Sequence, residues 1–128
     1  VAAFNMVEAS DGKYITIGWG GGPYFTSMEE WTIDGMNDGE AYVFGAEVDV
    51  SKILIEGLSL AYGYGKFNGN AQTTSGSSKV EEHDLIVSYA FAENAYLEMS
   101  YADVKDKENK GVTDVGYDRF LVRANYVF

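Results

Sequence analysis

The chain has 128 residues, enough for one domain, and no proline-rich or charged linker divides it, so we expect a single unit from residue 1 to residue 128. A formal net charge of −11 argues against nucleic acid as a partner, because phosphate binding needs a concentrated basic surface, and it leaves cations as partners. The absence of cysteine excludes disulfides and thiolate metal sites, and the sequence contains neither an apolar run long enough for a membrane helix nor a leader peptide.

Six segments alternate between apolar and polar residues with a period of two, which is the period of a β-strand. In chain order they are residues 14–19, 41–50, 57–65, 83–91, 95–103 and 118–128. Residues 1–9 alternate poorly and are a candidate seventh strand. Tyrosine, phenylalanine and β-branched residues recur in these runs and the chain has a single proline, so strands are favoured over helices. We therefore predict an all-β protein.

The last segment shows what the alternation implies. One face carries Phe120, Val122, Ala124, Tyr126 and Phe128, and the other carries Arg119, Arg123 and Asn125. In a soluble sandwich the apolar face would pack on a core and the arginines would meet bulk water. In an outer-membrane barrel the apolar face meets lipid and the arginines line a wet lumen.

The connections between the segments are alternately long and short. Counted backwards from the last strand, they span about residues 105–117, 92–94, 66–82, 51–56 and 20–40. Short turns at one end and long loops at the other are typical of outer-membrane barrels, in which the short turns are periplasmic. A soluble meander has no need of this asymmetry.

Aromatic residues on the apolar faces gather at two levels. Those expected near the long loops are Tyr42, Phe44, Tyr62, Tyr64, Tyr101 and Phe120, and those expected near the short turns are Tyr89, Phe91, Tyr126 and Phe128. The residues between the two levels, Leu60, Val87, Met99, Val122 and Ala124, are aliphatic. Two aromatic girdles around an aliphatic band predict an antiparallel up-and-down transmembrane β-barrel, although tyrosine and phenylalanine also favour strands in a soluble sandwich core.

Two stretches resemble a known family. "FLVRANYVF" (residues 120–128) resembles the C-terminal assembly signal of outer-membrane porins, which the barrel-assembly machinery reads through a terminal Phe and apolar residues at every second position. "WGGGPYFTSMEEWTI" (residues 19–33) is similar to a loop segment of the OprD-like porins and the related major outer-membrane porins of epsilonproteobacteria. The resemblance implies a barrel of about 18 strands, often trimeric, that passes small solutes, amino acids or carboxylates. It also implies contact with outer-membrane lipid and lipopolysaccharide.

The chain is too short to be such a barrel by itself. Six or seven strands cannot close even the smallest usual barrel, which has about eight. We expect a segment of a larger barrel, the C-terminal portion of an outer-membrane porin, completed either by more of the same polypeptide or by several copies.

The faces that alternate with the apolar ones supply the candidate site residues. The expected pore-lining residues are Glu47, Asp49, Ser59, Asp84, Ser88, Glu98, Ser100, Arg119 and Arg123, and Phe120, Tyr126 and Phe128 are expected to form the membrane girdle and assembly signal. Glu47 and Asp49 face the row Ser59, Ala61, Gly63 and Gly65, whose side chains are too small to fill a bore, which suits an open passage. Alternatively, these small residues ease strand curvature and the carboxylates are simply solvated. The two arginines resemble the basic ladder of OprD-like porins, or they form ion pairs that brace the wall, with Glu98 as a partner.

No motif supports catalysis, a cofactor or a metal. Residues 34–40 ("DGMNDGE") lack EF-hand spacing and are interpreted as a solvated loop. His83 is interpreted as a solvated rim residue at a strand start, without a G-x-S-x-G serine partner. We expect passive diffusion of small hydrophilic solutes and ions through a channel of the Gram-negative outer membrane, with a preference for cations and the arginines as a handhold for carboxylates. The alternatives are a small outer-membrane barrel with an adhesive or anchoring role, and a soluble secreted sandwich.

Overall fold

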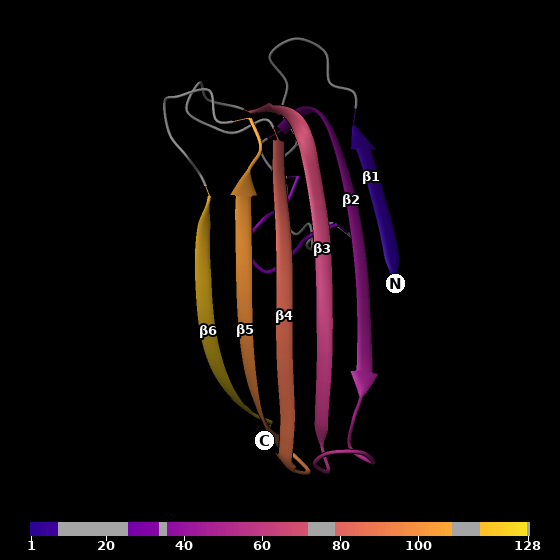
Figure 1. Cartoon of the computed structure of the whole chain (residues 1–128), viewed down its shortest axis with the longest axis vertical. Helices are drawn as coiled ribbons and strands as arrows, with labels where there is room; N and C mark the ends of the chain where they lie inside the picture. Colours follow the sequence, from indigo (N-terminus) through magenta and orange to yellow (C-terminus); the bar gives the residue numbers. More distant parts are fainter. Residues whose placement is uncertain (8–25, 34–35, 72–78, 109–115, 128) are drawn as a thin grey trace.

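The computed structural model of the protein describes residues 1–7, 26–33, 36–71, 79–108 and 116–127. The strands are β1 (Ala2–Val7), β2 (Met36–Asp49), β3 (Leu58–Ala71), β4 (Lys79–Ala92), β5 (Ala95–Asp106) and β6 (Tyr117–Tyr126). They form one sheet in which every strand pairs antiparallel with its neighbours in sequence, in the order β1-β2-β3-β4-β5-β6 (Figure 1). This confirms the prediction of an all-β, antiparallel, up-and-down protein.

The sheet does not close into a barrel. β1 and β6 are its two edges, and the strands between them curve around one side in Figure 1. The candidate strand at the start of the chain is present as β1, paired with β2 through partners such as Phe4 and Tyr42. The predicted strand 14–19 lies outside the described residues, as does Phe128.

The central strands are longer than the alternating runs predicted. β3 continues to Ala71 and β4 already begins at Lys79, so much of the long connection predicted between them is strand. His83 consequently lies inside β4 and not at its start. Residues 36–40, interpreted from sequence as loop, belong to β2, where a bulge between Asn37 and Glu40 places Asp38 at a φ of 48°. Ladder hydrogen bonds pair these ends, whose outer face is polar and whose inner face contributes Phe67 and Val80 to the core.

The two short turns lie together at one end of the sheet, the lower end in Figure 1. In the turn between β2 and β3, the backbone N–H of Ser51 donates to Asp49 Oδ1 over 2.8 Å, and that of Gly57 donates to Ser51 Oγ over 3.1 Å. Gly57 has a φ of +80°, and a Cβ there would collide with the Ala90 carbonyl near the end of β4. Glycine is therefore the only residue that fits at position 57, where the β2–β3 turn contacts β4, without strain.

Residues 26–33 lie against one face of the sheet, which we call the inner face; the opposite one is the outer face. The core is small and sits between this segment and the inner face: it consists of Ile33, Ala41, Phe67, Val80 and Val104, with Met28, Trp31 and Val43 packed against it. We call residues 26–33 the inward segment. Its docking positions the candidate site.

Candidate functional site

The outer face carries a continuous apolar band. Its members are Phe44, Ala46 and Val48 of β2, Leu58, Leu60, Tyr62 and Tyr64 of β3, Leu85, Val87, Tyr89 and Phe91 of β4, Leu97, Met99 and Tyr101 of β5, and Phe120, Val122, Ala124 and Tyr126 of β6. One row of paired residues across the sheet, Val48, Leu60, Val87, Met99 and Val122, is wholly aliphatic. The register therefore aligns these residues at one level, as the alternation predicted.

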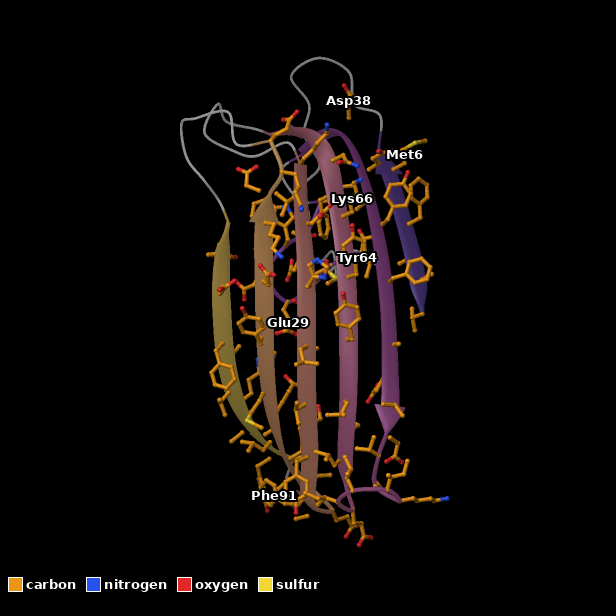
Figure 2. All side chains as sticks on the ribbon, in the orientation of Figure 1. Met6, Glu29, Asp38, Tyr64, Lys66 and Phe91 are labelled. Atoms are coloured by element: carbon orange, nitrogen blue, oxygen red, sulfur yellow. The ribbon has the colours of Figure 1, made fainter. Side chains whose placement is uncertain are left out.

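Aromatic side chains occur at both limits of this band. Tyr62, Tyr101 and Phe120 lie in one row, and Tyr126 and Phe91 lie near the short turns. In Figure 2, Phe91 lies at the short-turn end and Tyr64 lies well above it on the same face. Phe120 and Tyr126 are 65% and 64% exposed, so these rings are not part of a core.

Charged residues of the outer face are confined to the side of the band away from the short turns. On the described strands they are Glu40, Lys66, Lys79, Glu81, Asp103, Lys105 and Asp118, and His83 lies among them. Lys105 Nζ lies 2.7 Å from Asp103 Oδ2, and Lys107, which directly follows β5, places its Nζ 2.9 Å from Glu81 Oε2. His83 is not simply solvated, because its Nδ1 lies 2.7 Å from Tyr62 Oη and its ring packs on Tyr64.

The inner face brings all nine predicted pore-lining residues to one side of the sheet, but in different surroundings. Ser59, Ser88 and Glu98 are half-buried, and Glu47 is exposed. The Asp49 carboxylate is engaged in the short turn through Ser51. Asp84 and Ser100, in contrast, are each only 4% exposed because the inward segment covers them.

Two carboxyl groups of β4 hold the backbone of the inward segment. Glu82 accepts hydrogen bonds from the N–H groups of Glu30 and Trp31, one on each carboxylate oxygen and each over 2.8 Å. Asp84 Oδ2 accepts the N–H of Glu29 over 3.1 Å. Three successive amides are thus satisfied by side chains of one strand, which fixes the height at which the segment lies.

The two arginines of β6 bind the side chains of the same segment. Arg123 donates to Glu29 Oε2 over 2.8 Å and to Glu98 Oε1 over 2.6 Å. Arg119 forms an ion pair with Glu30, whose other oxygen accepts the Tyr117 hydroxyl over 2.9 Å. The predicted pair between Arg123 and Glu98 is confirmed, and the arginines brace the inward segment as well as the wall. Figure 2 shows Glu29 midway up the sheet.

Part of the small-residue row is not open. A Cβ added at Gly65 would lie 2.8 Å from Met28 Cγ, and one at Gly63 would lie 3.1 Å from Met28 Cε. The Met28 side chain packs directly on the backbone of these two glycines, and we call this contact surface the Met28 seat. The expectation of an open passage over the whole row is therefore wrong for the buried Gly65, whereas Gly63 is only partly covered and still borders open space.

Beside this seat, the inner face is hollowed. An open groove of about 720 Å³ is lined by Ser27, Met28 and Glu29 of the inward segment and by residues of β2, β3 and β4 that include Glu47, Ala61 and Asp84. This volume is in the range of small-molecule sites. The groove brings carboxylates from three parts of the chain around one space that water and small solutes can enter.

Glu82 is the most unusual ionisable group of this arrangement. It is wholly buried and lies beyond the apolar band, on the side away from the short turns. Burial and the neighbouring Asp84 carboxylate raise the pKa of Glu82 to about 8. Partial burial and the adjacent Glu30 likewise raise the pKa of Tyr117 to about 12, so this phenol remains a hydrogen-bond donor at neutral pH.

Sequence reasoning missed Glu29, Glu30 and Glu82. The paired glutamates in "SMEEW" could have been noticed, because two adjacent carboxylates in an otherwise apolar stretch suggest cationic partners. Glu82 is two residues before Asp84 and therefore faces the same side of the sheet, but it lies in a stretch that the sequence predicted to be a loop. Its burial depends on the inward segment and has no local signal.

Among the described residues, no group of three or more His, Cys, Asp or Glu side chains has an arrangement that could hold a metal ion. The described part of the chain also contains no helix with the length and apolar character needed to span a membrane. No protein-family model matches the chain, and neither a curated protein nor a solved structure is significantly similar to it.

Proposed function

We propose that the chain forms part of the wall of a channel in the bacterial outer membrane. Its outer face would contact lipid, and its inner face would line a water-filled path for passive diffusion of small hydrophilic solutes and ions. The observation that supports this most strongly is the apolar band, which no charged residue of the described strands interrupts. A soluble protein rarely exposes so large an apolar surface.

The extent of the band is of the order of a membrane's apolar layer. Phe120 and Tyr126 are six residues apart on β6, which corresponds to about 20 Å along the strand at roughly 3.4 Å per residue, and to less along the membrane normal because barrel strands tilt. The apolar band of outer-membrane barrels is about 25 Å tall and has aromatic girdles at both interfaces. The charged residues beyond the Tyr62 and Phe120 row would then lie at the level of lipid head groups.

The open edges of the sheet require further strands. Within the described residues, β1 and β6 each have an unpaired edge, and an unpaired backbone group in lipid costs several kcal/mol. We therefore propose that this sheet is a sector of a larger barrel, closed by more of the same polypeptide or by other copies. A homotrimer, contact with lipopolysaccharide, and recognition of residues 120–128 by the barrel-assembly machinery belong to the same proposal, which involves no enzymatic activity.

The charge of the inner face favours cations. Carboxyl groups on this side include Glu29, Glu30, Glu47, Asp49, Glu82, Asp84 and Glu98, and the arginines are Arg119 and Arg123. The charged side chains that the described residues contribute to the groove itself are those of Glu29, Glu47 and Asp84, and neither arginine is among its lining residues. Fixed charge of this kind concentrates counter-ions in a narrow path.

A small barrel with an adhesive or anchoring role is the second candidate. It is favoured by the inward segment, since Met28 fills the space above Gly63 and Gly65, as in a packed bore. The groove beside the segment favours the channel. Conductance across a planar bilayer discriminates between the two, because a packed barrel conducts no ions.

Ion selectivity tests the proposed path. Glu47→Gln removes a groove carboxylate, so the reversal potential in a salt gradient should shift toward anions. The shift should be clear at about 10 mM salt, where the Debye length is roughly 30 Å, and small at about 1 M, where it is roughly 3 Å. Glu93→Gln is the matched control, because it removes the same charge at an exposed short turn. Equal shifts for the two variants would contradict the assignment of the groove to the ion path.

A further inference from the structure

The contact between β4 and the inward segment combines two buried carboxyl groups with three backbone donors. Glu82 and Asp84 are two residues apart on β4, both face the inner side of the sheet, and they are 0% and 4% exposed. Together they accept the N–H groups of Glu29, Glu30 and Trp31. No lysine or arginine is paired with either carboxyl group among the described contacts, because the arginines of β6 bind Glu29 and Glu30.

This arrangement favours a proton in the pair. Two adjacent carboxylates in a buried site repel each other, and removing both from water adds a further penalty. Within the part of the chain that the structure describes, the buried Asp84 Oδ1 has no hydrogen-bond partner. A proton held by Glu82 lowers the charge of the pair and supplies a donor for this oxygen. Both effects are lost when the inward segment leaves and water reaches the two groups.

We propose that Glu82 and Asp84 form a proton-dependent latch, which holds the inward segment on the sheet while the pair keeps a proton and releases it when both groups ionise. The effect on conduction rests on the proposed channel function, because release would widen the path beside Gly63 and Gly65. The latch itself requires only the docked segment.

The charged groups around the latch act in the same direction. Glu29 and Glu30 of the inward segment bring further negative charge toward the pair, and Arg119 and Arg123 of β6 are already bound to them. Tyr117 donates its hydroxyl to Glu30 and not to Glu82. β3 contributes glycines at this level, and β5 contributes Ser100, which donates to Glu29. None of these groups neutralises a doubly ionised pair.

The direction of the pH dependence follows from the two states. In the docked state the pKa of Glu82 is about 8, whereas in water its ordinary value is 4.5. The docked state therefore binds more protons between these values, and docking weakens as pH rises through this range. Because one proton is involved, the equilibrium constant for docking falls by at most a factor of ten for each pH unit. The segment should be docked at pH 6 and released progressively as pH rises through 8.

Fluorescence of Trp31 measures docking directly. Trp31 is half-buried against the core, and Trp19→Phe leaves it as the single tryptophan of this chain. In the folded Trp19→Phe protein, the emission maximum of Trp31 should shift to longer wavelength between pH 6 and pH 9.5, because release exposes this side chain to water. Glu82→Gln cannot ionise and keeps one carbonyl oxygen for one of the two backbone amides, so its emission should not change between pH 6 and pH 9.5. Glu81→Gln, the matched change on the outer face, should titrate like the parent.

A second variant guards against misfolding of the first. Asp84→Asn keeps an acceptor for the Glu29 amide and removes the neighbouring negative charge, so the pair can no longer be doubly ionised and the change in emission between pH 6 and pH 9.5 should be smaller than in the parent. Constant emission of the parent from pH 6 to pH 9.5, or an unchanged titration in both Glu82→Gln and Asp84→Asn, would overturn the latch. If Trp31 titrates as expected in a protein that forms no channel, the proposed function is contradicted and the latch is supported.

Discussion

Gly65 shows how a single residue determines what the inner face can hold. A Cβ at this position would lie 2.8 Å from both Met28 Cγ and Phe67 Cε2, closer than such contacts allow. Phe67 is fully buried in the core and cannot move away without disturbing it. The absence of a side chain at Gly65 is therefore what allows the inward segment to dock at this height.

Gly65→Ala should loosen the inward segment. We expect a loss of stability of about 1–3 kcal/mol, as for other overpacked sites, and a higher single-channel conductance because the segment no longer seats. Thermal unfolding in detergent and planar-bilayer recordings measure the two effects. Gly45→Ala is the matched control: its Cβ meets only the Tyr62 carbonyl at 3.8 Å, an ordinary contact, so both quantities should stay near the parent values. If the two variants have the same thermal stability and conductance, the packing of Met28 does not depend on a glycine at position 65.

At the scale of elements, the short turns set the pairing of β2, β3 and β4. The N–H of Ala90 donates to the Gly57 carbonyl over 2.8 Å, so the two strand ends meet at a point where only glycine fits. Asp49 and Ser51 satisfy the turn's own amides. This network explains why a residue expected to line a pore is engaged in a turn.

Gly57→Ala should destabilise the sheet. The positive φ is unfavourable for alanine, and the added Cβ collides with the Ala90 carbonyl, so we expect a loss of about 1–3 kcal/mol in the free energy of unfolding. Urea denaturation in lipid vesicles measures it. Lys52→Ala, an exposed substitution in the same turn, should change the free energy by less than about 0.5 kcal/mol. A neutral Gly57→Ala would mean that the turn can adopt another geometry.

At the scale of the whole molecule, the two faces of one sheet have opposite environments. The core between the sheet and the inward segment is small, whereas the large apolar side chains of the outer face, such as Phe44 and Phe120, are 67% and 65% exposed. In the described part of the chain, no second layer covers this outer face. Lipid is the covering that the proposed function supplies.

Cysteine labelling tests this orientation, and the chain has no native cysteine to interfere. In the assembled protein, cysteines at Val87, Met99 or Val122 should be protected by lipid from a small water-soluble thiol reagent. Cysteines at Ser59 or Ser88 should react, because these inner-face positions are half-buried and face the groove side. A cysteine at Ser100 should react slowly, since Glu29 and its neighbours cover that position. Equal labelling on both faces would contradict the membrane orientation.

Much of the sheet was predictable from the sequence because its determinants are local. Successive side chains of a strand point to opposite faces, so the alternation in residues 57–65, 83–91, 95–103 and 118–126 was sufficient to assign each residue to a face. The same geometry aligned Leu60, Val87, Met99 and Val122 at one level once the short turns set the register. The strand ends were not predictable in this way, since backbone pairing with neighbours extends them through polar residues such as Lys66 and Glu81.

Only the tertiary structure decided what the inner face holds. Arg119 and Arg123 meet Glu30 and Glu29 across 89 and 94 residues of sequence, and no local pattern connects positions so far apart. Glu82 is buried because a distant segment places its amides on it. Alternation alone therefore determined which side of the sheet each residue faces, since this depends on the geometry of one strand. The depth, partners and protonation of each inner-face residue depend on contacts that form only when the inward segment docks.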